Sequence, residues 1–235
     1  MQGSWVALKD RDGRELRAYV AGSPEAPAAV LVVHDYFGIS DFTRASVERL
    51  AAHGYQALAI DLYNGKTATT HESAAALMQT YTEQDRRVGD AALQAGVDAL
   101  KRPGRRLATL GFSMGGAQAL RAAANDPQAV RASVTAYGFG YDTWPCEQVA
   151  AMRGSVLTLS GALDDGALQS SIGFLKNKCA TGPAVELYVL PRVGHAFAQP
   201  LFNGGQGYDV AATEAMWQVI DGFLARQLRV PKQTK

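Results

Sequence analysis

Residues 111–116 read Gly-Phe-Ser-Met-Gly-Gly, a Gly-X-Ser-X-Gly pattern followed by one more glycine. An apolar run, Leu107–Leu110, precedes the pattern, and an Ala- and Leu-rich segment, Ala117–Ala124, follows it. This order predicts a strand, a sharp turn and a helix. Glycines on both sides allow the backbone to turn tightly, so that the Ser113 hydroxyl stands clear of the sheet edge as a candidate nucleophile.

A serine hydroxyl is too weak an acid to attack a carbonyl unaided, so this hypothesis requires a histidine base and a carboxylate that orients the base. In enzymes with such a turn, the acid and then the histidine follow the serine along the chain. Of the four histidines, His195 alone lies after Ser113, and it follows the run Val185–Leu190, a predicted last strand. We therefore expect His195 to be the base, the alternative being a surface-loop histidine without a role.

Six carboxylates lie between Ser113 and His195, and their places relative to the predicted strands distinguish them. Residues 155–160 predict a buried strand, and the turn after it contains Asp164 and Asp165. We expect Asp164 to orient His195, because Asp165 could instead cap a helix that begins near residue 166.

Acyl transfer also requires donors aimed at the oxyanion of the tetrahedral intermediate. One is expected from the backbone N–H of Met114, at the positive end of the predicted helix. The second is expected from the Tyr36 amide, in the loop after Ala29–Val33, an apolar run that predicts a central parallel strand.

Predicted strands and helices alternate along the chain. The elements are an N-terminal hairpin of residues 5–9 and 15–20, strands at 30–33 and 56–60, a helix at 41–53 between them and a last helix at 210–228. One more helix is predicted to face the sheet with its small side chains: Val88, Ala91, Ala92, Ala95 and Ala99. The alternation favours an α/β fold with a mostly parallel sheet covered on both faces.

Four motifs together resemble the dienelactone hydrolase family: His-Asp-Tyr-Phe-Gly at 34–38, Asp-Leu-Tyr at 61–63, the 111–116 pattern, and Gly-His-Ala-Phe-Ala at 194–198. The resemblance extends from about Val6 to Leu228. It implies the α/β-hydrolase fold with a small lid or none. It also implies a Cys/Ser-Asp-His triad that matches Ser113, Asp164 and His195, with oxyanion donors that match Tyr36 and Met114.

Three positions depart from the family pattern. The best-known members use a cysteine nucleophile where this chain has Ser113, which points to ordinary ester or lactone hydrolysis. They place a glutamate at the position of Asp35, and an arginine that holds the substrate carboxylate four residues after the histidine, where this chain has Gln199. Whether dienelactone itself is a substrate is therefore left open.

Several side chains near predicted strand ends could line a substrate pocket, although plain core packing is equally expected for each aromatic one. The candidates are Asp35, Tyr36, Phe37, Tyr137, Phe139, Tyr141, Trp144, Phe197 and Gln199. No cofactor or metal is expected, because the adjacent His34 and Asp35 lack further ligands. The basic run 101–106 and Arg86 with Arg87 are expected to be solvated surface features, and Asp61 to hold a loop.

Composition is that of a compact enzyme. The 235 residues, 47% of them hydrophobic, suit a single α/β-hydrolase domain over 1–235. The formal charge of +1 gives no field that would attract nucleic acid, and no apolar run is long enough to cross a bilayer. With no signal peptide visible, we expect a cytoplasmic monomer or small homo-oligomer whose Cys146 and Cys179 are free thiols, since a disulfide would imply export.

The sequence thus predicts a serine hydrolase that cleaves carboxylic ester or lactone bonds of small molecules through an acyl-enzyme. Acyl transfer to another acceptor or amide cleavage on the same scaffold is the first alternative, since fold does not settle reaction class. A non-catalytic small-molecule binder is the second alternative.

Overall fold

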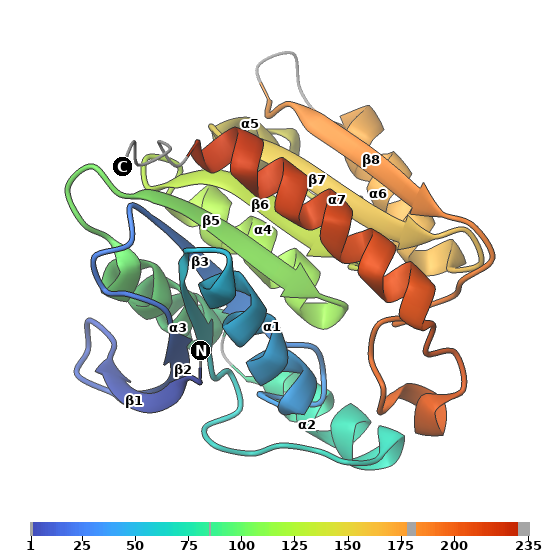
Figure 1. Ribbon diagram of the computed structural model, residues 1–235, viewed down its shortest axis with the longest axis horizontal. Coiled ribbons are helices and arrows are strands. Elements are labelled where there is room, and N and C mark those ends of the chain that lie inside the picture. The colour runs from blue at the N-terminus through green and yellow to red at the C-terminus, as the bar shows by residue number, and fades with distance from the viewer. Residues whose placement is uncertain (1, 85, 178–181, 230–235) are drawn as a thin grey trace.

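One eight-stranded sheet runs through the computed structural model, which describes residues 2–84, 86–177 and 182–229 (Figure 1). The spatial order is β1-β2-β4-β3-β5-β6-β7-β8. The strands are β1 Ser4–Lys9, β2 Glu15–Ala21, β3 Ala28–Val33, β4 Gln56–Ile60, β5 Arg106–Phe112, β6 Val130–Ala136, β7 Ser155–Gly161 and β8 Val185–Leu190. Strands β3 to β8 are parallel to their neighbours, whereas the hairpin β1–β2 joins β4 antiparallel.

Helices cover both faces of the sheet. Helices α1 (Asp41–Ala52) and α7 (Val210–Leu228) lie on the near face in Figure 1, and α3 (Arg86–Leu100) and α4 (Met114–Asn125) lie behind it. The remaining helices are α2 (His71–Glu83), α5 (Cys146–Ala151), α6 (Asp165–Asn177) and the 3-10 turn η1 (Phe202–Gly205). Because helices cover both faces, every residue of β3 is buried, as its unbroken apolar sequence requires. The predicted mostly parallel, doubly covered sheet is confirmed.

The buried side of α3 matches the predicted one only in part: Ala92 and Ala95 are buried as expected. Ala99 is exposed and Val88 is only partly buried, whereas Gly89, Leu93, Gly96 and Leu100 are buried. A Cβ on Gly96 would lie 2.7 Å from Leu31 Cδ1. The helix therefore approaches the sheet closely at Gly96, a position that the predicted face did not include.

The structure bears on the predicted state of the cysteines and on the length of apolar helices. Cys146 is disulfide-bonded, so the expectation of a free thiol at this position is wrong. Cys179 lies outside the described residues. Among the helices that the structure describes, none is both long enough and apolar enough to span a bilayer.

Candidate active site

Ser113 occupies the turn between β5 and α4 with φ 52° and ψ −121°, a backbone conformation that residues other than glycine rarely adopt. The neighbouring glycines are required by close approach. A Cβ on Gly111 would lie 2.0 Å from the Gly115 carbonyl oxygen, and a Cβ on Gly115 would lie 2.4 Å from the carbonyl oxygens of Val33 and His34. The strained turn is therefore packed directly against the end of β3, and the flanking glycines are required as the sequence pattern predicted.

Three side chains from separate loops form a continuous line of hydrogen bonds. Ser113 Oγ lies 2.9 Å from His195 Nε2, and His195 Nδ1 lies 2.7 Å from Asp164 Oδ2. Ser113 is 5% exposed and Asp164 is 7% exposed, whereas the His195 side chain is 26% exposed. The imidazole thus links a buried carboxylate to a serine hydroxyl at the end of the sheet from which β5 leads into α4.

Asp164 also caps a helix, a role that the sequence analysis gave to Asp165. Its Oδ1 accepts a hydrogen bond from the Ala167 N–H at 3.1 Å, at the start of α6. Asp164 therefore caps this helix, and the expected cap at Asp165 is wrong. Because one oxygen is held by the helix and the other by His195, the carboxylate has a fixed orientation.

The two predicted oxyanion donors belong to different segments of the chain. Met114 begins α4, and Tyr36 follows β3 in the loop that carries Asp35. Within the described parts of the chain, neither of these two backbone N–H groups donates a hydrogen bond to another protein group. Buried backbone donors are rarely left without a partner, so both are available to a ligand oxygen.

Asp35 is 2% exposed and is held at both carboxylate oxygens. Oδ1 accepts from the Phe37 N–H at 2.9 Å, and Oδ2 accepts from Gln199 Nε2 at 2.5 Å. Burial raises the pKa of the Asp35 carboxyl to about 6, against the opposing effects of these hydrogen bonds and of the His195 charge. The carboxylate is thus a structural anchor of the loop that precedes α1.

His34 uses both of its ring nitrogens in hydrogen bonds. Nε2 accepts from the Leu62 N–H at 3.1 Å, so Nδ1 carries the proton and donates to the Asp35 carbonyl oxygen at 2.6 Å. Burial lowers the pKa of His34, which keeps the ring neutral. His34 therefore joins the loops after β3 and β4, and its ring has no free nitrogen for a metal.

Most of the predicted pocket residues lie in the core. Phe37 and Phe197 are fully buried, Tyr141 packs on Phe174 at 5.5 Å between ring centroids, and Trp144 packs against the hydrophobic core. Asp35 and Gln199 bond to each other, as described above. Phe37, Phe197 and Tyr141 therefore contribute to core packing, which was the alternative expected for each aromatic candidate.

Two of the rings that contact His195 belong to predicted pocket candidates: Tyr137, at 5.7 Å between ring centroids, and Phe139. Phe139, 38% exposed, lies 5.8 Å from the imidazole, and Phe202 lies 5.5 Å from it between ring centroids. His71, at the start of α2, binds the Tyr36 hydroxyl through Nδ1 at 2.7 Å and contacts Phe202 at 6.3 Å. Sequence reasoning missed Phe202 and His71, since neither belongs to a motif. Phe139 and Phe202 therefore place apolar surface beside the imidazole.

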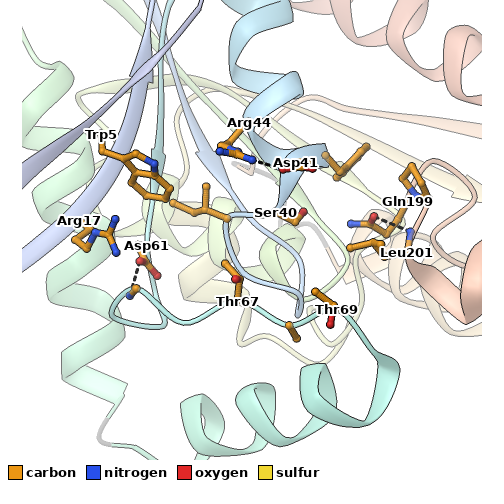
Figure 2. Close-up of a pocket in the computed structure, with 15 residues that line it drawn as sticks. Trp5, Arg17, Ser40, Asp41, Arg44, Asp61, Thr67, Thr69, Gln199 and Leu201 are labelled. Atoms are coloured by element: carbon orange, nitrogen blue, oxygen red, sulfur yellow. Dashed lines mark hydrogen bonds and ion pairs between the residues drawn. The ribbon is translucent and has the colours of Figure 1, made fainter.

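A separate cavity of about 510 Å³ lies between the β1–β2 hairpin, the start of α1 and residues 199–201 (Figure 2). Its lining includes Trp5, Arg17, Ser40, Thr67, Gln199 and Leu201, but not Ser113, Asp164 or His195. The hydrogen-bonded Ser113, His195 and Asp164 are the better indicator of chemistry, since none of the three side chains lines this cavity.

Two other sequence features make contacts within the protein. Asp61 accepts from the Tyr63 N–H at 2.8 Å and from the Gly65 N–H at 2.6 Å, and so holds the loop after β4. In the basic run, Lys101 pairs with Asp98 at 3.1 Å. These contacts agree with the expectation of supporting roles.

The dienelactone hydrolase family model matches residues 16–228 of the chain. Carboxymethylenebutenolidase 1 of Cupriavidus pinatubonensis is 27% identical, over 91% of this chain and 92% of that protein. Among solved structures, a dienelactone hydrolase-like promiscuous phosphotriesterase from metagenomic libraries has a TM-score of 0.77 at 23% identity, covering 97% of this chain and 99% of that one.

The dienelactone hydrolase from Anabaena variabilis has a TM-score of 0.74 at 22% identity, covering 97% of this chain and 98% of that one. These structural likenesses agree with the strand order and with the helices on both faces of the sheet. The family match covers most of the chain, including all four motifs. The chain belongs to the dienelactone hydrolase family and is an ester or lactone hydrolase built on the α/β-hydrolase fold.

Proposed function

We propose that the chain hydrolyses carboxylic ester or lactone bonds of small molecules, with Ser113 as nucleophile, His195 as general base and acid, and Asp164 as the acid that orients the imidazole. The observation that carries the proposal is the hydrogen-bonded line from Ser113 Oγ through His195 to Asp164, at 2.9 Å and 2.7 Å. It starts at a serine in the strained turn conformation expected of a nucleophile between a strand and a helix.

In the first step, Ser113 Oγ attacks the carbonyl carbon while His195 Nε2 takes the hydroxyl proton. The amides of Met114 and Tyr36 receive the oxyanion, and Asp164 stabilises the imidazolium. The tetrahedral intermediate then collapses, the bond to the leaving alkoxide breaks, and the proton passes from His195 to the alcohol. For a lactone, the alcohol stays attached to the acyl group.

In the second step, water attacks the acyl-enzyme as His195 takes one of its protons. The intermediate collapses to a carboxylic acid, and the proton returns to Ser113 Oγ. The apolar rings of Phe139 and Phe202 beside His195 suit an uncharged group at the mouth of the site. No metal or cofactor takes part in this scheme.

The test compares the wild type with Ser113→Ala on short p-nitrophenyl esters, simple lactones and dienelactone. We expect turnover to fall by several orders of magnitude in Ser113→Ala, and a fluorophosphonate probe to label the wild type only. Ser23→Ala, at an exposed serine, is the matched control and should behave as wild type. Near-normal turnover in Ser113→Ala would overturn the assignment, and products formed with added alcohol or amine would reveal acyl transfer.

A further inference from the structure

Two loops that carry different parts of the candidate site are joined by one buried side-chain contact. Gln199, four residues after His195, donates from Nε2 to Asp35 Oδ2 at 2.5 Å, across a sequence separation of 164 residues. Gln199 is 1% exposed and Asp35 is 2% exposed. A hydrogen bond to a buried carboxylate is among the stronger kinds, so this contact fixes the distance between the two loops.

Gln199 is itself held rigidly. Its Oε1 accepts from the Leu201 N–H at 3.1 Å, a contact drawn in Figure 2, and its own backbone N–H donates to the Ala196 carbonyl at 2.8 Å. Both ends of the side-chain amide are therefore used within the protein. The orientation of Nε2 toward Asp35 is set by the same short loop that presents His195.

Asp35 transmits this restraint to the neighbouring peptide groups. Its Oδ1 accepts from the Phe37 N–H at 2.9 Å, which closes a side-chain turn around Tyr36. The N–H proposed as the second oxyanion donor belongs to Tyr36, inside this turn. Among the described residues, no lysine or arginine forms an ion pair with Asp35, so Gln199 and the Phe37 amide are its partners.

We propose that Gln199 is a positioning residue, which holds the Tyr36 N–H in register with Ser113 and His195 by fixing Asp35. The proposal rests on the function proposed above. Loss of one oxyanion donor commonly lowers kcat by about 10² to 10³-fold, and small misplacements in a reacting geometry have comparable effects. Because the donor acts mainly on the transition state, Gln199 variants should lower kcat and leave KM nearly unchanged.

The discriminating variant is Gln199→Glu, which has nearly the same shape but presents a carboxyl to Asp35. Two adjacent carboxyls share one proton at low pH and repel each other when both ionise. The other titratable groups whose charges act on Asp35 or are acted on by it are His195, Tyr36, Tyr63 and Tyr137, and His34 precedes it in the chain. None of them replaces the lost donor, so the contact should form at low pH and break as pH rises.

The experiment measures kcat and KM on a neutral p-nitrophenyl ester from about pH 5.5 to pH 9, together with the rate of fluorophosphonate labelling. The ratio of kcat for Gln199→Glu to that of wild type should fall by about 10²-fold across this range. Gln199→Met, which lacks both hydrogen bonds, should lower kcat at every pH. Gln128→Glu, at an exposed glutamine, is the matched control and should keep a constant ratio near one.

A pH-independent ratio for Gln199→Glu, or wild-type kcat in Gln199→Met, would overturn the positioning role while leaving the proposed function intact. Turnover and labelling that survive Ser113→Ala in the same assay would overturn the proposed function, and the positioning role with it. Because the main readout is the change with pH within one variant, a uniform loss of folded protein cannot imitate it. Far-UV circular dichroism at both ends of the pH range checks that each variant remains folded.

Discussion

Replacing Asp35 by asparagine should change how the stability of the protein depends on pH. Burial raises the pKa of this carboxyl from 3.8 to about 6 in the folded state. Between these two pH values the unfolded chain has released the proton while the folded chain keeps it. The folded state therefore binds more protons, and its free energy of unfolding falls as pH rises.

The magnitude follows from the same two values. Each pH unit between the two pKa values corresponds to 1.36 kcal/mol. The free energy of unfolding therefore falls by about 3 kcal/mol in total, a loss that is complete once the pH is well above 6. About half of this loss, ~1.5 kcal/mol, falls between pH 5 and pH 8. Asparagine does not ionise, so the free energy of unfolding of Asp35→Asn should rise relative to wild type by this amount over that interval.

Urea denaturation followed by far-UV circular dichroism, at pH values from about 5 to 8, measures the difference. Asparagine turns an N–H toward Gln199 Nε2, so the variant is expected to be less stable than wild type at low pH, and the slope with pH is the decisive quantity. Asp41→Asn, at a carboxylate whose side chain is 91% exposed, should leave the slope nearly unchanged. A difference in the free energy of unfolding between Asp35→Asn and wild type that does not change with pH would refute the reasoning. If Asp35→Asn instead became less stable relative to wild type as pH rises, hydrogen bonding to the carboxylate would outweigh its burial.

Three further outcomes are expected. Ser113→Gly should be more stable toward urea than Ser113→Ala by about 1 kcal/mol, because glycine adopts φ 52° without strain; equal stability would argue against a strained turn. Gly115→Ala should lower the free energy of unfolding by about 2 kcal/mol or more, since its Cβ meets two backbone oxygens at 2.4 Å, whereas Gly222→Ala, with open space at its Cβ apart from an arginine tip at 3.7 Å, should not destabilise. Asp164→Asn should lower kcat by about 10⁴-fold with a circular dichroism spectrum like that of wild type, and a loss below tenfold would contradict its role beside His195.

The arrangement of strands and helices was largely predictable, because it follows from local patterns. The hairpin, the buried β3 and the last helix carry periodicities or turn signals that act within a few residues. The glycine pattern around Ser113 was equally readable, because a tight turn allows few side chains. The face of α3 was predictable only in part, since Gly89 is buried against Tyr81 of α2 and Gly96 against Leu31 of β3.

The candidate site divides in the same way. Chain order and strand ends selected Ser113, Asp164 and His195 from the sequence, because parallel strands bring their ends to one edge of the sheet. Only the tertiary structure decided that Asp164 also caps α6, that Phe202 rather than Phe197 faces His195, and that Gln199 holds Asp35. The physical reason is that strands, turns and helices reflect the conformation of adjacent residues, whereas contacts between loops distant in sequence depend on how the whole chain packs.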